Sequence, residues 1–150
     1  MIDITKIKIS TMMLNDLEQI KENLQTDFDD FWNYNILKNE LETESSYYCV
    51  CKINTEIIGF AGISIILDIA EINNIVVKKS YRGRGIGGEL LESLIDLCGD
   101  LHMRTFTLEV DTENAPAIHL YEKFGFKNLG VRKKYYNGSR DAYIMTKSDF

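Results

Sequence analysis

The chain has 150 residues, of which 45% are apolar and 27% charged, and its formal net charge is −6. This balance is typical of one globular domain with a substantial core, and an acidic chain without basic blocks argues against nucleic-acid binding. No apolar run approaches the roughly 20 residues of a membrane span, and three cysteines are too few for a disulfide framework. We therefore expect a single cytoplasmic domain over residues 1–150, with no membrane, nucleic-acid or metal partner.

The N-terminal half of the sequence predicts a strand, two helices and a hairpin. Alternating isoleucines indicate a first strand over Ile2–Ile9. A helix capped by Asn15 or Asp16 follows, and then come an aromatic segment and a second helix. Two strands, Tyr47–Ile53 and Ile57–Ile65, are joined by turn residues and predict a hairpin.

The stretch Tyr81–Gly88 stands between an apolar strand pattern, Glu71–Val77, and an amphipathic helical pattern that begins at Ile86. Within that strand pattern, the pair Asn73-Asn74 disturbs the alternation and is compatible with a bulge. A glycine-rich turn in this position offers free backbone N–H groups at the positive end of a helix, which favours an anion such as a phosphate. Four basic side chains add to the local positive field: Lys78, Lys79, Arg82 and Arg84.

Two phosphate-bearing ligands are compatible with this turn. Gly83, Gly85 and Gly88 formally spell GxGxxG, but the dinucleotide fingerprint needs glycine directly after the strand and an acidic residue about 20 positions on. Here polar and basic residues separate the strand from the glycines. The other pattern, Arg82-x-x-Gly85-x-Gly87, resembles the pyrophosphate loop of the GNAT superfamily of acetyl-CoA-dependent N-acetyltransferases. Coenzyme A is therefore favoured over a nicotinamide dinucleotide, and a plain strand–helix turn is the third alternative.

The C-terminal half predicts a helix that ends at Gly99, a strand, a further helix and a hairpin. Thr105–Val110 alternates between apolar and polar residues. Asn114 is a good N-cap for the next helix, and Gly125 closes that helix as the residue beyond its C-cap. Two strands follow around the turn Asn137-Gly138. This order predicts an α/β (α+β) fold with a mixed sheet of about seven strands and about four helices.

Six segments together resemble the GNAT fold, and within it the ribosomal-protein-alanine N-acetyltransferase group. They are Asn74–Val77, Arg82–Gly88, Leu108–Val110, Asn114–Phe126, Val131–Tyr136 and Asp141–Met145. The resemblance implies a single GNAT domain that transfers an acetyl group from acetyl-CoA to a protein N-terminal amine. It also implies a protein or peptide acceptor, which includes a ribosomal protein as one option, and we expect a monomer or weak dimer.

Acetyl transfer from a thioester to an amine requires a group that takes the amine proton and benefits from an acid that protonates the departing thiolate. The resemblance implies that Glu109 is the base and Tyr121 the acid. Without it, Glu109 would be a solvated polar residue on a half-buried strand, and Tyr121 would be a core tyrosine whose hydroxyl is satisfied.

The resemblance also assigns residues to the coenzyme. Main-chain groups of the strand that precedes the glycine turn would pair with the pantetheine arm, although these residues also suit an ordinary core strand. The turn would hold the pyrophosphate, and Asn114 would add a contact beyond its role as a cap. The cofactor-binding set is Ile75, Val76, Val77, Arg82, Gly83, Arg84, Gly85, Ile86, Gly87, Gly88 and Asn114.

Two aromatic segments are candidates for the acceptor site. Phe28 and Trp32 lie between the first two helices, and Tyr135 and Tyr136 lie beside the last hairpin turn. Packing in the core is the alternative for all four. The tyrosine pair favours a peptide amine over a free small amine or a lysine side chain, and a non-catalytic acyl-CoA-binding module is the remaining alternative.

Overall fold

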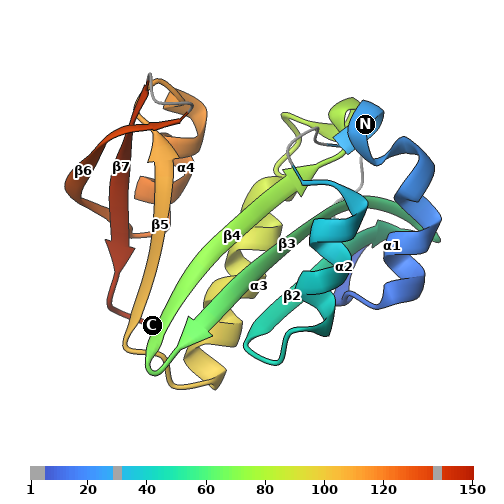
Figure 1. Cartoon of the computed structure of the whole chain (residues 1–150), viewed down its shortest axis with the longest axis horizontal. Helices are drawn as coiled ribbons and strands as arrows, with labels where there is room; N and C mark the ends of the chain where they lie inside the picture. Colours follow the sequence, from blue (N-terminus) through green and yellow to red (C-terminus); the bar gives the residue numbers. More distant parts are fainter. Residues whose placement is uncertain (1–5, 29–31, 137–139) are drawn as a thin grey trace. The chain divides into compact units, whose positions relative to one another are not determined.

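The computed structural model describes residues 6–28, 32–136 and 140–150, and for residues 134–136 it describes the backbone alone. The described strands form one mixed sheet of seven strands in the order β1-β2-β3-β4-β5-β7-β6, and the described helices include four α-helices (Figure 1). This confirms the predicted α/β fold. The elements are β1 Ile7–Thr11, α1 Leu14–Ile20, η2 Lys21–Asn23, η3 Leu24–Phe28, α2 Tyr34–Glu42, β2 Ser46–Ile53, β3 Glu56–Ile66, β4 Ile69–Val77, η4 Lys79–Tyr81, α3 Ile86–Asp100, β5 Thr105–Asp111, α4 Ala115–Lys123, β6 Lys127–Tyr136 and β7 Arg140–Lys147.

The chain forms two compact units. Unit 1 comprises Met1–Ser64 and Asn73–Leu94, and unit 2 comprises Ile65–Ile72 and Ile95–Phe150. The prediction of one domain over residues 1–150 stays a prediction. None of the helices in the described ranges is long and apolar enough to cross a membrane.

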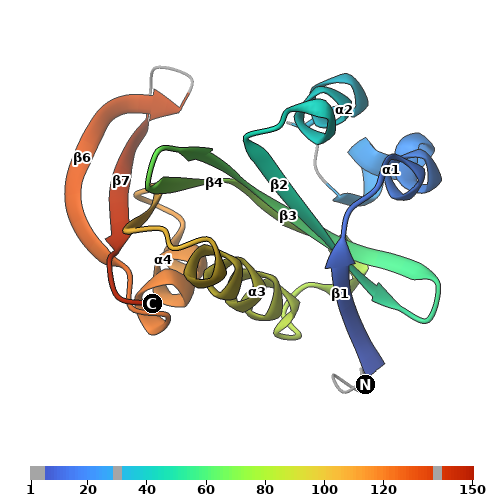
Figure 2. The same ribbon diagram turned by 90° about the horizontal axis from the view of Figure 1, so that it is seen from below.

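In unit 1, β2 pairs antiparallel with both β1 and β3. Helices α1 and α2 cover one face of these strands, and the first part of α3 covers the other (Figure 2). The first face holds a buried cluster that includes Leu17, Phe28, Leu37, Tyr48 and Phe60. On the other face α3 approaches closely: a Cβ added at Gly59 would lie 3.1 Å from the Leu90 side chain. Glycine at this position therefore permits the helix–sheet contact.

The first strand and helix differ from the prediction in their boundaries. Within the described residues the strand runs Ile7–Thr11, and the predicted positions 1–5 lie outside them. The N-cap of α1 is Met13, whereas Asn15 and Asp16 were expected to cap it. Asp16 nevertheless serves this helix end, because its carboxylate accepts a hydrogen bond from the Met13 N–H at 2.8 Å.

In unit 2, β7 pairs antiparallel with both β5 and β6, while the first residues of β4 pair parallel with β5. The core of this unit includes Phe106 and Phe126, whose ring centroids lie 5.4 Å apart at 62°. Helix α4 begins as predicted, because Asn114 Oδ1 accepts a hydrogen bond from the Ala117 N–H at 3.3 Å. It also ends as predicted, because Gly125 has a φ of 93° and donates its N–H to the Glu122 carbonyl.

The end of α3 is one residue later than predicted. The helix ends at Asp100, beyond Gly99, and the residue with left-handed backbone is His102, with a φ of 58°. His102 N–H bonds to the Gly99 carbonyl and Met103 N–H to the Cys98 carbonyl. This is the Schellman pattern of a helix C-terminus, here with histidine in place of glycine.

Candidate active site

The glycine turn connects β4 to α3 in unit 1. A short 3₁₀ helix, η4, follows the strand, and α3 begins at Ile86 as predicted. Gly83 and Gly85 have φ values of 76° and 85°, a conformation that side-chain-bearing residues rarely adopt. A Cβ added at Gly83 would have no heavy atom within 4 Å, so the backbone of the turn is open to a ligand at this point.

The start of α3 has the properties of an anion site. The first intrahelical hydrogen bond runs from Glu89 N–H to the Gly85 carbonyl. The N–H groups of Ile86, Gly87 and Gly88 therefore precede the helical ladder and lie at the positive end of a 15-residue helix. This arrangement fits the pyrophosphate of a coenzyme.

The basic side chains of the turn have different surroundings. Lys78 Nζ lies 3.0 Å from a carboxylate oxygen of Glu56, and the guanidinium of Arg84 lies 5.6 Å from the centroid of the Tyr81 ring. Arg82 donates hydrogen bonds to two backbone carbonyls instead. The backbone N–H groups and Arg84 are thus the better-placed candidates for a phosphate.

The β4 strand departs from alternation at its two asparagines. Asn73 Nδ2 donates to Ser64 Oγ at 2.8 Å, and Asn74 Nδ2 donates to the Tyr48 hydroxyl at 3.3 Å. Ser64 and Tyr48 share a face, because Ser64 pairs with Ser46, which is two residues from Tyr48 on β2. Adjacent residues in a regular strand point to opposite faces, so this pair forms an irregularity of the kind that a bulge produces.

Beyond the asparagines, β4 returns to alternation. Val76 is buried in the core of unit 1, and Ile75 and Val77 are half-buried. The side chain of Val76 thus belongs to an ordinary core strand. A role of this strand toward a coenzyme would rest on its main-chain groups.

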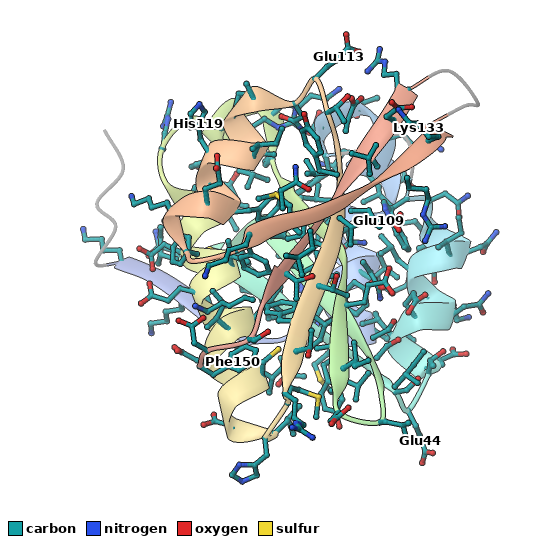
Figure 3. The ribbon with its side chains drawn as sticks, turned by 90° about the vertical axis from the view of Figure 1, so that its left-hand side faces the viewer. Glu44, Glu109, Glu113, His119, Lys133 and Phe150 are labelled. Carbon is teal, nitrogen blue, oxygen red and sulfur yellow. The ribbon has the colours of Figure 1, made fainter. Side chains whose placement is uncertain are left out.

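Glu109 lies midway along β5 in unit 2 (Figure 3). The burial of this strand alternates as predicted: Phe106, Leu108 and Val110 are buried, and the residues between them are half-buried. The Glu109 side chain is 13% exposed, and its Oε1 lies 2.8 Å from a guanidinium nitrogen of Arg132 on β6. A carboxylate held this way can accept a proton from a bound amine, directly or through water.

Tyr121 lies on α4, also in unit 2. It is half-buried, and its ring packs edge-on against Phe126 with centroids 5.8 Å apart. The Asn114 side chain is engaged in the cap of the same helix. The structure therefore places both predicted catalytic residues in unit 2, whereas the glycine turn belongs to unit 1.

The predicted acceptor residues have separate environments. Phe28 is fully buried, and its ring centroid lies 6.0 Å from that of Phe60. This environment corresponds to the alternative of packing in the core. Trp32 is partly buried and packs against the same cluster. The side chains of Tyr135 and Tyr136 lie outside the described part of the chain, so their predicted role stays a prediction.

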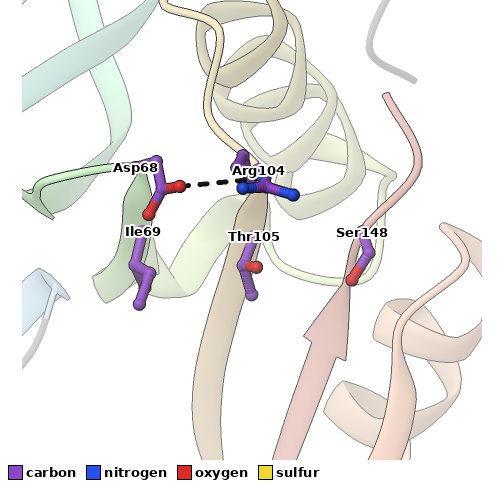
Figure 4. A pocket seen from close by; sticks show the side chains of 5 residues that line it. All are labelled: Asp68, Ile69, Arg104, Thr105 and Ser148. Carbon is purple, nitrogen blue, oxygen red and sulfur yellow. Dashed lines mark ion pairs between the residues drawn. The ribbon is translucent and has the colours of Figure 1, made fainter.

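A surface pocket of about 540 Å³ lies at the start of β5. Asp68 and Arg104 form an ion pair of 3.8 Å in its lining, which also includes Ile69, Thr105 and Ser148 (Figure 4). Thr105 precedes Glu109 by four residues on an extended strand, which corresponds to roughly 13 Å. This pocket is therefore separate from the candidate catalytic carboxylate.

The cysteines are unpaired and lie in packed positions. All three are free; Cys51 and Cys98 are buried, and Cys49 is half-buried. Burial raises the pKa of Cys49 to about 11 and that of Cys51 and Cys98 to about 12, so these thiols are poor nucleophiles at neutral pH. The described residues contain no group of metal-ligating side chains.

Two features of the site were not predicted from the sequence. One is the ion pair between Arg132 and Glu109, and the other is the contact of Arg82 with the carbonyl of Phe28. The residues of each pair are far apart along the chain, and no local pattern of the sequence signals such contacts.

Comparisons with known proteins identify the family and the fold of this chain. Residues 11–126 match the family described as Acetyltransferase (GNAT) family. A Bacillus subtilis protein, provisionally named ribosomal protein bS18-alanine N-acetyltransferase, is 36% identical over 94% of this chain and 95% of its own length. The N-alpha-acetyltransferase RimI of Mycobacterium tuberculosis is 35% identical over 78% of this chain and 75% of its own. The crystal structure of the ribosomal-protein-S18-alanine N-acetyltransferase from Escherichia coli superposes with a TM-score of 0.83 at 32% identity, covering 93% of this chain and 92% of that one.

Proposed function

Because the chain belongs to the GNAT family of acetyltransferases, we propose that it transfers the acetyl group of acetyl-CoA to the α-amine of a protein N-terminus. The observation that carries the choice of acceptor is the likeness, over nearly the whole chain, to a relative named as a ribosomal protein bS18-alanine N-acetyltransferase. That relative and this chain differ at most positions, so the proposal concerns the class of acceptor, a protein N-terminus with a small first residue.

The coenzyme would be held mainly by backbone groups of unit 1. The N–H groups of Gly83 to Gly88 would bind the pyrophosphate, and Arg84 would add positive charge. The main chain of Ile75, Val76 and Val77 would pair with the amide-rich pantetheine arm. The open backbone at Gly83 and the N-terminus of α3 support this assignment.

Glu109 and Tyr121 would carry out the two proton transfers. Glu109 accepts a proton from the acceptor amine, directly or through water, as the amine nitrogen forms a bond to the thioester carbonyl carbon. Tyr121 then donates its hydroxyl proton to the departing thiolate as the carbon–sulfur bond breaks, and recovers a proton from solvent. The half-buried carboxylate of Glu109 beside Arg132 supports the first of these roles.

The acceptor would contact aromatic residues at its amine end. Trp32 remains a candidate wall of that site, and Tyr135 and Tyr136 remain candidates for hydrogen bonds to the peptide backbone. Phe28 packs in the core and is not part of this proposal.

A peptide panel tests the acceptor. Peptides that differ in their first residue, and one N-terminally blocked peptide with an internal lysine, are incubated with acetyl-CoA, and the acetylated position is read by mass spectrometry. We expect the free α-amine of a peptide that begins with alanine to be acetylated, and the blocked peptide to stay unmodified. Spermidine is tested alongside the peptides. Faster acetylation of spermidine or of the internal lysine would favour a small-molecule or lysine acceptor instead.

The Glu109→Gln variant tests the chemistry in the same assay. Loss of the base should lower kcat by roughly 10² to 10⁴, with acetyl-CoA binding little changed. Glu113→Gln is a matched control, because Glu113 follows the same strand and its side chain is largely exposed. Equal kcat in both variants, with acetyl transfer shown to be rate-limiting, would leave Glu109 as a polar strand residue.

A further inference from the structure

The guanidinium of Arg82 joins two separate parts of unit 1. Its Nε donates a hydrogen bond to the Val77 carbonyl at 3.0 Å, and one terminal nitrogen donates to the Phe28 carbonyl at 2.7 Å. Val77 is the last residue of β4, and Phe28 is the last residue of the π-helical turn η3. The Arg82 side chain therefore connects the end of β4 to the end of η3.

The Phe28 carbonyl gains a donor at this position. The last carbonyls of a helical segment have no intrahelical partner, and Arg82 supplies one at the end of η3. The Phe28 side chain is fully buried against Phe60, so its backbone is anchored from the other side as well. A planar guanidinium can donate to both carbonyls at once, which the single ammonium of lysine does less well.

Trp32, one of the acceptor candidates, lies close to the end of η3 along the sequence. Trp32 follows Phe28 by four residues and packs against the same buried cluster. Asn33 then caps α2, because its Oδ1 accepts a hydrogen bond from the Ile36 N–H at 3.0 Å. The carbonyl that Arg82 holds therefore belongs to a residue of the same buried cluster against which Trp32 packs.

We propose that Arg82 is a positioning residue that fixes the end of η3 against the glycine turn, and that it acts on acceptor binding more than on the coenzyme phosphates. The acceptor part of this inference rests on the proposed function. The sequence pattern alone assigned Arg82 to the pyrophosphate, but its guanidinium hydrogen bonds run to main-chain carbonyls. Arg84 differs, because its guanidinium lies over the face of the Tyr81 ring.

Three variants separate a phosphate ligand from a positioning residue. Arg82→Lys keeps the positive charge but loses the planar fork, Arg82→Gln loses both, and Arg84→Gln is the matched control for loss of charge in the same turn. For each variant we would measure the Kd of CoA by calorimetry, KM and kcat for the alanine peptide, and amide hydrogen exchange of residues 24–28.

The positioning role predicts one pattern of results. Arg82→Lys should leave the Kd of CoA within about twofold of the parent, because its charge is retained, and should raise the peptide KM about tenfold, the scale of a lost hydrogen bond to a charged group. Exchange in residues 24–28 should be faster by a similar factor, whereas kcat at saturating peptide should change little. Arg84→Gln should do the reverse: weaken CoA binding, and leave exchange in residues 24–28 as in the parent.

Two results would overturn the inference. One is a Kd of CoA in Arg82→Lys that rises as much as in Arg84→Gln, and the other is an unchanged peptide KM in both Arg82 variants, even with faster exchange. If the parent acetylates no peptide, the proposed acceptor fails. The CoA affinity and the exchange of residues 24–28 would then still decide whether Arg82 joins η3 to the turn.

Discussion

At the scale of single residues, the candidate base and its cation come from different strands. Alternation along β5 was enough to predict which face Glu109 occupies, because side chains alternate in every strand. Alternation could not predict that Arg132 pairs with Glu109, because this ion pair depends on the registers of β7 with β5 and of β6 with β7. The ion pair engages Oε1 of the carboxylate at 2.8 Å, so Arg132 is placed to orient the candidate base.

The effect of Arg132 can be measured with a double-mutant cycle. Arg132→Gln should lower kcat about tenfold to a hundredfold, because a misoriented base loses much of its effect. In a Glu109→Gln background the same change should have little further effect, since the group that it orients is gone. Lys133→Gln, which removes a neighbouring exposed cation, is the control. Independent, multiplicative losses in the double variant would show that Arg132 acts elsewhere.

Single residues also show where sequence reasoning was limited. Phe28 and Trp32 have the same aromatic character and lie close together in the chain, yet Phe28 is fully buried and Trp32 is not. Local composition does not separate a fully buried aromatic residue from a partly buried one, because burial is decided by which elements pack over the residue.

At the scale of elements, Glu56 joins the start of β3 to the residues before the glycine turn. Its carboxylate accepts hydrogen bonds from Lys78 Nζ and from the Tyr81 hydroxyl, both at 3.0 Å. The hydrogen bond from Lys78 is the main cause that lowers the pKa of Glu56 below its ordinary value of 4.5. A carboxyl whose pKa is lowered in the folded state stabilises the fold at pH values above its unfolded pKa. That contribution is lost as the pH falls through the folded-state pKa.

Glu56→Gln should therefore reduce the free energy of unfolding at neutral pH only. We expect a loss of about 0.5 kcal/mol at pH 7, the scale of an exposed ion pair, and a difference that disappears as the pH falls well below 4.5. Urea unfolding of both proteins over this pH range gives the measurement. Glu44→Gln, at an exposed turn between α2 and β2, is the control, and an equal loss in that variant would mean that overall charge is responsible.

Two glycines near the ends of α3 and α4 have different backbone conformations, so replacement by alanine should affect stability in opposite directions. Gly125 has a φ of 93°, so Gly125→Ala should lower the free energy of unfolding by about 1 kcal/mol through backbone strain. Gly99 lies within α3, and a Cβ there would lie 3.9 Å from the Phe150 side chain, an ordinary contact distance. Gly99→Ala should therefore raise the free energy of unfolding by roughly 0.5–1 kcal/mol. Urea denaturation that gave the same sign for both would contradict this account.

The element boundaries that were predicted well have local causes. Asn114 and Gly125 frame α4 as expected, because a cap needs only its own side chain or backbone freedom. Met13 and His102 were missed, because neither residue type signals a cap. Met13 depends on Asp16, whose carboxylate accepts a hydrogen bond from the Met13 N–H, and His102 adopts a left-handed conformation that is rare for side-chain-bearing residues.

At the scale of the whole molecule, the order of strands and helices was predictable and the assignment of residues to two units was not. Periodicity identifies each element from its own residues. The units, however, divide β3, β4 and α3 within their lengths, so they follow from contacts between distant segments. The same limit applies to the acceptor, since the fold and the glycine turn are compatible with several amines.

The coenzyme gives the last prediction, because a ligand that binds the folded chain stabilises all of it. The chain carries a net charge of −6, which disfavours a polyanion at a distance, so binding must come from the local donors at the start of α3. CoA at a hundredfold its Kd should add about 2.7 kcal/mol to the free energy of unfolding and raise the melting temperature, whereas NAD should not. Gly87→Glu should abolish the shift, since it places a carboxylate where the pyrophosphate would approach the helix N-terminus, while Glu92→Gln, farther along α3, should keep it. A shift with NAD and none with CoA would contradict the assignment of the glycine turn to coenzyme A.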